Sequence, residues 1–422
     1  VVIKSMHMRY SQIIGKTKKD APKDEESISA QLLLRGGFIH KEIAGVYTYL
    51  PLGLKVLNKI VQVIREEMEA IDGQEMSLTA LQNPETWKKT GRYDDDVVDI
   101  WFKTKFKNGT ETCLAITHEE PLTNLMVQQI DSYKDLPLYA FQFQTKFRNE
   151  IRAKGGLLRV REFLMKDLYS FDKTKEDHEK YYERAKQAYI KIWERLGIGD
   201  DTYVTFASGG SFSKFSHEFQ TVCETGEDTV YLDRKKKIAI NKEVLNDEVL
   251  NELGVNKNDL EEVRAIEVGN IFPLGTKFSD ALGLYYTDEK GEKKPVIMGS
   301  YGIGPGRVMA TIVELKHDDK GIIWPENIAP YKVMLIGLNL EDIALRKRAE
   351  SIYGLLKANK IEVLYDDRED VTAGQKFADC DLLGIPYRVI VSQKTGFKIE
   401  LKKRTENSTQ EISAEELLYI LK

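Results

Sequence analysis

FQTKFRNEIRAKGGLLRVREFLMKDLYSF, residues 143 to 171, is the most informative stretch of this 422-residue chain. Arginines and lysines surround a Gly-Gly pair, and runs rich in Phe, Leu and Tyr flank them on both sides. This arrangement predicts an antiparallel hairpin with strands over 138–148 and 157–171. Another alternating segment predicts a strand over 97–106.

The hairpin carries groups suited to a polyanion. Arg148 ends the first predicted strand and Arg159 follows the turn, and a guanidinium fork matches the geometry of phosphate oxygens. Phe163 lies four residues after Arg159, so we expect it on the same strand face as a platform for a purine ring. Glu150 can accept a hydrogen bond from an exocyclic amine. A charged hairpin with a solvated basic tip explains the same residues if they are considered alone.

Composition excludes several classes of protein. Hydrophobic residues make up 42% and charged residues 31%, which is typical of a globular chain with two or three domains. No run reaches ~18 apolar residues, and the first residues lack signal-peptide features, so we expect a cytoplasmic protein without membrane contact. Cys113, Cys223 and Cys380 form no CxxC pair, which predicts free thiols. A net charge of −5 gives no global attraction to nucleic acid.

Three further regions have clear patterns. Apolar positions at helical spacing predict a long helix over 52–71, entered through Pro51, and a second helix over 174–196, opened by Thr174. Residues 233–266 are polar with a weak helical period, which indicates a short insert or surface crossover. A solvated connector is the simpler interpretation of that segment.

From residue 331 the chain alternates strand and helix patterns, which predicts a separate α/β domain over 331–422. YKVMLIGL, KIEVLYDD and YRVIVS are typical of buried strands, and 341–358, 374–384 and EISAEELLYIL of helices. The proline-containing segment 324–330 is the expected linker.

Other motifs give the hairpin a context. AGVYTYLPLGLKVLNKI (44–60) leads a strand through proline into a helix, and GSYGIGPGRVMATIVE (299–314) brings Arg307 to a helix start. With the hairpin between them, they resemble the three signature motifs of class II aminoacyl-tRNA synthetases. The resemblance extends to bacterial-type prolyl-tRNA synthetases through LLLRGGFIHKEIAGVYTYLPLGLKVL (32–57), THEEPLT (117–123), SHEF (216–219), EVGNIFPLGTKFS (267–279), WPENIAP, DDR and ADCDLLGIPYRVIV (within 324–391).

The resemblance implies an α+β catalytic domain with an antiparallel sheet over 8–323, because Met8 is a plausible start, and a C-terminal α/β anticodon-binding domain. It implies a homodimer formed through the first-motif helix. The implied reaction is ATP-dependent attachment of L-proline to tRNA(Pro) through prolyl-adenylate, with release of AMP and pyrophosphate and with Mg²⁺ as cofactor. Catalysis would rest on positioning and on charge stabilisation.

The same resemblance implies roles around ATP. Arg148 would contact the α-phosphate and the proline carboxylate, and Arg159 the γ-phosphate. Glu150 would bind the adenine amine, while Phe163 and Arg307 would cover the two adenine faces. Glu267 would lie beside ATP and assist magnesium, with Asn270 near it.

For proline, the implied residues are Thr117, Glu119, Arg148, His217 and Ser300. A buried ammonium needs a carboxylate partner, and we expect Glu119 to be that partner. An alternative for THEE is a helix start with Thr117 as N-cap and an acidic first turn. GGSFSKFSHEF (209–219) is the other expected pocket element, although a plain flexible loop would have the same composition.

Three departures from the family pattern are visible. The 233–267 interval is too short for the inserted editing domain that many bacterial relatives carry, so that module is absent. Ser300 replaces the usual cysteine of GCYGIG, and Asn270 replaces a common histidine. Pro305 and Gly306 replace the more usual Val-Ser.

The C-terminal domain would bind tRNA. Residues 331–422 contain 15 basic and 15 acidic residues, so any basic surface must be confined to one face. The candidates are Lys376, Arg388, Lys402, Lys403 and Arg404, with Glu362 to Asp370 as a reader of base edges. Ordinary solvated surface is the alternative for each.

Two other functions compete with this hypothesis. One is a related class II synthetase for threonine, serine or glycine, which the absent zinc constellation and the GGS…SHEF segment disfavour. The other is a noncatalytic synthetase-like tRNA-binding protein, which the presence of Arg148, Glu150, Phe163 and Arg307 disfavours.

Overall fold

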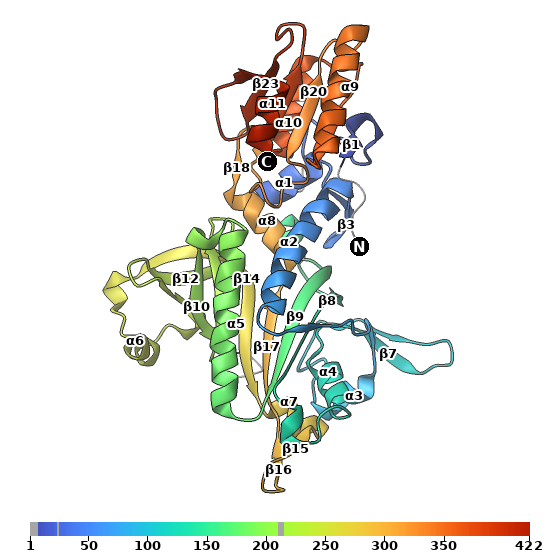
Figure 1. Cartoon of the computed structure of the whole chain (residues 1–422). Helices are drawn as coiled ribbons and strands as arrows, with labels where there is room; N and C mark the ends of the chain where they lie inside the picture. Colours follow the sequence, from blue (N-terminus) through green and yellow to red (C-terminus); the bar gives the residue numbers. More distant parts are fainter. Residues whose placement is uncertain (1–6, 23–24, 210–214) are drawn as a thin grey trace. The chain divides into compact units, whose positions relative to one another are not determined.

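The computed structural model describes residues 7–22, 25–209 and 215–422, and the chain divides into two compact units (Figure 1). The central unit comprises residues 43–46 and 60–311, and the terminal unit comprises 1–42, 47–59 and 312–422. This division cuts helix α8 (Pro305–Leu315) and groups the N-terminal residues with the C-terminal part. The domain limits 8–323 and 331–422 stay a prediction.

A nine-stranded sheet forms the centre of the central unit. Neighbouring strands are antiparallel except for the pairs β10–β13 and β4–β8. The expected hairpin is present, with Leu138 opposite Phe171 and Phe147 opposite Glu162. In spatial order the strands are β11 (Phe215–Val222), β10 (Thr202–Ser208), β13 (Ile238–Asn241), β12 (Asp228–Asp233), β14 (Glu261–Gly275), β17 (Ile297–Ile303), β9 (Glu162–Asp172), β8 (Leu138–Phe147) and β4 (Gln74–Glu75).

The predicted strand over 157–171 begins too early. Gly155 and Gly156 adopt positive φ angles of 66° and 60°, and residues 156–158 form a 3-10 turn before β9 starts at Glu162. Arg159 therefore does not lie on a strand with Phe163, and the argument that placed both on one strand face is wrong.

The predicted strand over 97–106 is reduced to β6 (Lys103–Lys105). Val98 and Ile100 instead pack against a cluster of Trp87, Trp101 and neighbouring side chains. Burial of this cluster outweighs the alternating pattern. β6 belongs to a separate three-stranded sheet with β7 (Glu111–Leu114) and β5 (Leu81–Gln82).

The two faces of the large sheet have different neighbours. α5 (Lys175–Arg195), the predicted 174–196 helix, is capped by the Thr174 side chain and packs on β9, β14 and β17, as Figure 1 shows. Lys166 Nζ donates to Tyr189 Oη of α5 at 2.6 Å. Because side chains alternate along a strand, Asp167 and Tyr169 point to the opposite face, where α4 (Glu119–Met126) lies.

The segment 233–266 is not a solvated connector. It supplies the end of β12, all of β13 and the start of β14, together with α6 (Asp247–Leu253). Its apolar residues pack against Phe206 of β10 and form a small separate core with it. The other buried members of this core are Ile240, Val244, Val249, Leu250 and Val255.

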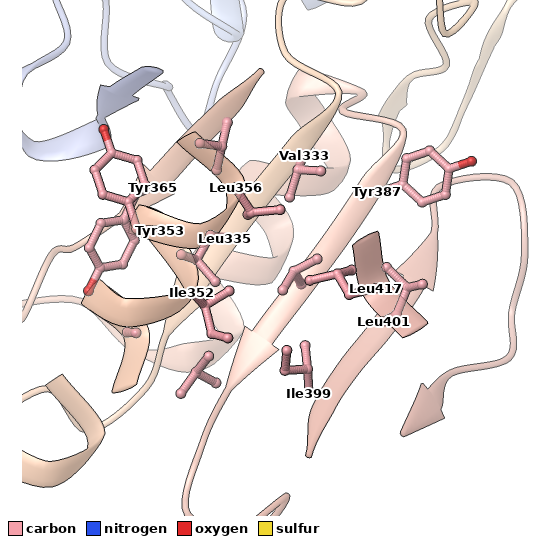
Figure 2. Close-up of a cluster of buried hydrophobic side chains, with 14 of the residues drawn as sticks. Val333, Leu335, Ile352, Tyr353, Leu356, Tyr365, Tyr387, Ile399, Leu401 and Leu417 are labelled. Atoms are coloured by element: carbon pink, nitrogen blue, oxygen red, sulfur yellow. The ribbon is translucent and has the colours of Figure 1, made fainter. Parts of the chain in front are cut away.

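The terminal unit confirms the predicted α/β pattern. Its sheet has the order β1 (His7–Arg9), β21 (Val363–Asp366), β20 (Val333–Gly337), β22 (Tyr387–Val391), β23 (Ile399–Lys403) and β24 (Gln410–Ile412). The first four run parallel to one another, β23 runs antiparallel to β22, and β24 runs antiparallel to β23. Figure 2 shows the apolar core that this sheet shares with α9 (Ile343–Ala358) and α11 (Ala414–Leu421). The sequence did not predict β1, β23 or β24.

The linker 324–330 forms no helix or strand, as expected, but it is not a free tether. Trp324 is buried and donates from Nε1 to the carbonyl of Leu383 at 3.1 Å. Ile328 and Ala329 are fully buried.

The long helix predicted over 52–71 is present as α2, which starts at Pro51. All three cysteines are buried, and no disulfide joins them, in agreement with the predicted thiols. The remaining helices are α1 (Ile28–Arg35), α2 (Pro51–Glu69), α3 (Pro84–Lys89), α7 (Lys277–Leu282) and α10 (Ala373–Leu383), and the remaining strands are β2 (Ile39–Ile43), β3 (Val46–Tyr49), β15 (Tyr285–Thr287), β16 (Lys293–Pro295), β18 (His317–Asp318) and β19 (Gly321–Ile322). No helix among the described residues is both long and apolar enough to span a bilayer.

We predict that Gly53→Ala strongly destabilises the protein. Gly53 lies in the first turn of α2, and a Cβ there would stand 2.0 Å from the carbonyl oxygen of Phe38, so the backbone would have to move. Overpacking of this kind costs about 1–3 kcal/mol or more. The matched control is Gly354→Ala on α9, where a Cβ meets nothing within 4 Å and should stabilise by ~1 kcal/mol. Thermal unfolding midpoints that shift equally for both variants would contradict the packing argument.

Candidate active site

The THEE segment turns into α4 at the sheet face opposite α5. The N-cap residue is His118, and the Thr117 hydroxyl donates to Glu119 Oε2 at 2.7 Å, so the interpretation of Thr117 as a helix cap is wrong. The acidic first turn, Glu119 and Glu120, is present as expected.

The Glu119 carboxylate is buried, with 3% exposure. Besides Thr117, it accepts from Ser300 Oγ at 3.1 Å and lies 3.4 Å from Tyr169 Oη. The nearest cation is Arg92 Nη1 at 3.5 Å. The structure therefore brings Thr117, Glu119 and Ser300 together as the sequence predicted, with neutral hydroxyl groups as the closest donors.

Arg92 is committed to another carboxylate. Its Nη1 donates to both oxygens of Glu120 at 3.0 Å, and Thr90 adds a hydrogen bond of 2.9 Å to the same carboxylate. Glu119 thus receives only the longer contact from this guanidinium.

Arg148 lies close enough to the Glu119 carboxylate for their charges to interact, although its interactions with Arg307 and Glu267 are stronger. Its Nε donates to the carbonyl of Ile116 at 3.4 Å, and its guanidinium stands 5.3 Å from the ring centre of Phe163. Neither Nη atom donates to another described residue. Burial, followed by the positive charge of Arg307, lowers the pKa of Arg148 from its ordinary value.

Arg307 of α8 forms an ion pair with Glu267 of β14. Arg307 Nη1 donates to Glu267 Oε2 at 3.0 Å, and Arg307 Nε donates to the carbonyl of Leu158 at 2.9 Å. Asn270 Nδ2 donates to the other carboxylate oxygen of Glu267 at 2.7 Å. The predicted Glu267, Asn270 and Arg307 group is therefore assembled.

Glu150 and Arg159 are paired with each other. Arg159 donates from Nε to Glu150 Oε2 at 2.9 Å and also contacts Glu227 at 3.3 Å. A ligand at this position would have to exchange those ion pairs for its own.

His217 is not brought to Glu119. Its Nδ1 lies 2.9 Å from Tyr182 Oη of α5, and it lines a cavity of about 280 Å³ on the α5 side of the sheet. The neighbouring Phe219 also packs against α5, through Tyr189 and Trp193. The strand pleat turns Glu218 the other way, where burial and Glu267 raise the pKa of Glu218 to about 8. Residues 210–214 of the GGSFSKFSHEF segment lie outside the described residues.

Four residues near Glu119 were not predicted: Arg92, Lys146, Asp167 and Tyr169. Lys146 is fully buried and donates to Asp167 Oδ1 at 2.8 Å. Tyr169 Oη donates to Asp167 Oδ2 at 3.0 Å. The sequence did contain a signal for Lys146 and Asp167, because a lysine or an aspartate inside a strongly apolar strand is rarely buried without a partner of opposite charge.

The residues of the terminal unit that were predicted to bind tRNA differ in their exposure to solvent. Lys376 is buried and donates to the carbonyl of Gly337 at 2.7 Å, so it cannot meet a phosphate at the surface as predicted. Arg388 is mostly buried over the Phe377 ring. Lys403 is exposed and Lys402 half-buried.

Several candidates of this unit form ion pairs, including Lys403, which contacts Glu406 at 3.3 Å. Arg404 pairs with Asp318, and Glu362 pairs with Lys55 at 2.8 Å. Within 362–370, Asp366 pairs with Arg368 and Glu369 with Arg346.

Comparisons with known proteins identify the family of this chain. Residues 102–316 match the tRNA synthetase class II core domain (G, H, P, S and T), and residues 332–422 match the anticodon binding domain. The proline–tRNA ligase of Rhodospirillum rubrum is 38% identical over 97% of this chain and 99% of its own length. That of Rickettsia rickettsii is 37% identical over 96% and 97%.

A longer relative and a solved structure extend the comparison. The alignment with the proline–tRNA ligase of Dehalococcoides mccartyi spans 550 positions at 33% identity, so that relative contains residues without a counterpart here. The prolyl-tRNA synthetase of Giardia lamblia, solved in complex with prolyl-adenylate, shares the fold with a TM-score of 0.76, at 18% identity over 93% of this chain and 75% of that one.

We predict that stability falls as the pH drops from 6.5 towards 4. Burial is the main cause that lowers the pKa of both His118 and His217 to about 4, against about 6.5 in an unfolded chain. Between these pH values the unfolded state binds more protons than the folded state. The contribution of the two histidines to the free energy of unfolding is therefore fully present above pH 6.5 and is lost as the pH falls towards 4.

The measurement is the unfolding midpoint between pH 7.5 and pH 5 for the wild type and for His217→Gln, which cannot titrate. The variant should show a smaller loss over this range. An identical loss would show that His217 protonates freely in the folded state.

Proposed function

Because this chain belongs to the proline–tRNA ligase family of class II aminoacyl-tRNA synthetases, we propose that Glu119 and Arg148 are the two anchors of its amino acid substrate. The enzyme attaches L-proline to tRNA through prolyl-adenylate and releases AMP and pyrophosphate. The observation that supports the anchors is the buried Glu119 carboxylate, whose closest donors are neutral hydroxyl groups. Arg148 is near enough for its charge to interact with Glu119, and its Nε donates to the carbonyl of Ile116, three residues before Glu119.

Glu119 accepts the secondary ammonium of proline. A cation that enters a buried pocket without a counter-charge loses several kcal/mol of hydration. Thr117 and Ser300 donate to Glu119 and so hold its carboxylate in one orientation while it keeps its charge. The serine that replaces the family cysteine thus has a defined hydrogen-bonding role. His217, on the α5 side, contributes to this pocket only after a rearrangement.

Arg148 holds the proline carboxylate against the α-phosphate of ATP. A carboxylate oxygen attacks the α-phosphorus, the bond to the bridging oxygen of the β-phosphate breaks, and pyrophosphate leaves. Arg148 and Arg307 stabilise the charge that develops at the phosphorus. Phe163 and Arg307 cover the adenine ring, and Asn270 orients Glu267. Glu150 and Arg159 meet the adenine amine and the γ-phosphate once their mutual ion pair opens.

Glu267 would be a carboxylate ligand of magnesium once one of its hydrogen bonds from Arg307 and Asn270 opens. Mg²⁺ prefers oxygen ligands and usually takes one or two carboxylates together with substrate phosphates. The described residues contain no group of three or more side chains arranged to hold a metal by themselves. Glu267 would therefore share the ion with ATP, and the ion would neutralise charge on the phosphate oxygens.

The terminal unit receives the tRNA anticodon. Lys402 and Lys403 are the predicted residues that remain accessible to phosphates, and Arg388 would act through the small part of its side chain that is exposed. We further propose a cytoplasmic homodimer.

Proline-dependent exchange of label between pyrophosphate and ATP tests this function. The wild type should catalyse exchange with proline and Mg²⁺, and threonine, serine or glycine should give little response. Folded protein without proline-stimulated exchange would contradict the proposal.

We predict that Arg148→Ala lowers kcat/KM for this exchange by more than ~3 kcal/mol in transition-state stabilisation, as expected for loss of a preorganised charged donor. Lys154→Ala is the matched control, because Lys154 is exposed at the hairpin tip and contacts Glu227 at 3.1 Å. Small and equal effects would show that the hairpin is only a basic surface.

A further prediction concerns alanine. A proline pocket cannot exclude the smaller alanine sterically, and the lost contact disfavours alanine by only ~1–3 kcal/mol. Residues 233–266 fold into three short pieces of sheet and one helix around their own apolar core, with no inserted domain. Purified enzyme with alanine and tRNA should therefore accumulate Ala-tRNA. Rapid hydrolysis of preformed Ala-tRNA, with Pro-tRNA spared, would contradict this.

A further inference from the structure

The geometry points to a further role inside the central unit: the buried pair Lys146 and Asp167, acting through His118 and Tyr169, is a positioning device for Glu119. The inference rests on the proposed function of Glu119. The device fixes the carboxylate in place and pairs Lys146 with Asp167, so that Lys146 does not compete with the substrate ammonium for Glu119.

Lys146 is the centre of this device. It lies on β8 with no exposed surface, and its ammonium donates to Asp167 Oδ1 at 2.8 Å and to His118 Nδ1 at 2.6 Å. Gln142, also on β8, donates to Asp167 Oδ2 at 3.0 Å. Each buried charge is therefore paired and hydrogen-bonded, as burial requires.

His118 joins this pair to the start of α4. Its Nε2 donates to the carbonyl of Thr79 at 3.1 Å, so Nδ1 is the acceptor for Lys146. Burial and the charge of Lys146 lower the pKa of His118 to about 4, which agrees with this neutral form. Because His118 directly precedes Glu119, its fixed ring fixes the backbone from which the carboxylate extends.

Tyr169 is the second connection. Its hydroxyl accepts from the His118 amide at 3.2 Å and has one proton to donate. The carboxylate of Asp167 lies 3.0 Å away and that of Glu119 lies 3.4 Å away, so the proton favours Asp167. Glu119 then keeps lone pairs that the substrate ammonium can use.

The charge balance gives this arrangement its chemical meaning. The cluster contains two cations, Lys146 and Arg92, and three carboxylates, on Asp167, Glu120 and Glu119. Lys146 pairs with Asp167, and Arg92 bonds both oxygens of Glu120. Glu119 has no contact with either cation shorter than the 3.5 Å to Arg92, so a bound ammonium can become its main charged partner, while Arg148 remains for the carboxylate of proline. Proline supplies such an ammonium, whereas a neutral molecule of the same shape does not.

Stability alone is a weak reason for such a cluster. Well-packed apolar side chains in place of a buried ion pair are often neutral or stabilising. The chain offers an internal comparison, because Lys166 is also buried but faces α5, where it bonds Tyr189 and the carbonyl of Tyr301.

The test measures KM for proline, KM for ATP and kcat in pyrophosphate exchange for Tyr169→Phe and Lys146→Met. Tyr169→Phe removes one oxygen atom and should raise KM for proline roughly tenfold or more, the scale of a lost hydrogen bond in a charged network, while KM for ATP stays unchanged. Lys146→Met should raise KM for proline at least as much. Unchanged proline KM in both variants would overturn the inference.

Two controls separate positioning from general loosening of the fold. Lys166→Met removes a buried lysine on the α5 face, and Tyr181→Phe removes a buried hydroxyl without a hydrogen-bond partner among the described residues. Both should leave the proline KM unchanged, and an equal rise in either would contradict the inference.

In Lys146→Met alone, the Asp167 carboxylate is buried without its cation, which costs stability. The double variant Lys146→Met/Asp167→Leu removes both charges and so avoids this cost. We expect its proline KM to stay raised, because Glu119 is no longer held. Full recovery would assign the pair a purely stabilising role. The wild type separates the two claims. If the wild type shows no proline-dependent exchange, the proposed function is wrong. If the wild type catalyses exchange and the variants have the same KM for proline, only this inference is wrong.

Discussion

A desolvated carboxylate is the constraint on which the site depends. Glu119 is 3% exposed, and an isolated carboxylate at such depth would take up a proton. Hydroxyl donors from Thr117 and Ser300 offset the loss of water without removing the charge. The result is a buried carboxylate whose closest partners are hydroxyl groups, so a cationic ligand can pair with it. A positive charge of this kind distinguishes an α-amino or imino acid from a neutral molecule of similar shape.

The large sheet makes this possible by separating two environments. The α5 face is packed with tyrosines and Trp193, and its buried lysine, Lys166, bonds only neutral groups. The opposite face collects the charged groups: Glu119 at the start of α4, the pair of Glu267 and Arg307, and Arg148, whose charge interacts with both. Strand alternation places one residue on each face in turn, so neighbouring residues such as Lys166 and Asp167 serve different environments. The same alternation directs His217 to α5 and Glu218 towards Glu267.

The sequence predicted those features that local chemistry determines. Pro51 marks the start of α2, the Gly-rich run delivers Arg307 to α8, and Thr117 bonds Glu119 two residues away. The meeting of Glu119 with the distant Ser300 was expected from the family resemblance and not from local chemistry. What the sequence could not predict depends on contacts between distant residues. The face of His217 follows from the packing of β11 on α5, and Lys376 is buried because its ammonium finds the carbonyl of Gly337. The Lys146–Asp167 pair becomes visible only when β8 and β9 are in register.

The most direct measurement of the central claim compares the binding of L-proline with that of tetrahydrofuran-2-carboxylate, which has the same ring and carboxylate but no ammonium. Calorimetric titration of the wild type and of Glu119→Gln with both compounds gives four affinities. We expect the wild type to prefer proline strongly, and Glu119→Gln to lose most of that preference while binding of the neutral-ring compound changes little. Equal losses for both compounds, or a preference for proline that survives in Glu119→Gln, would contradict the assignment of Glu119 as the partner of the ammonium.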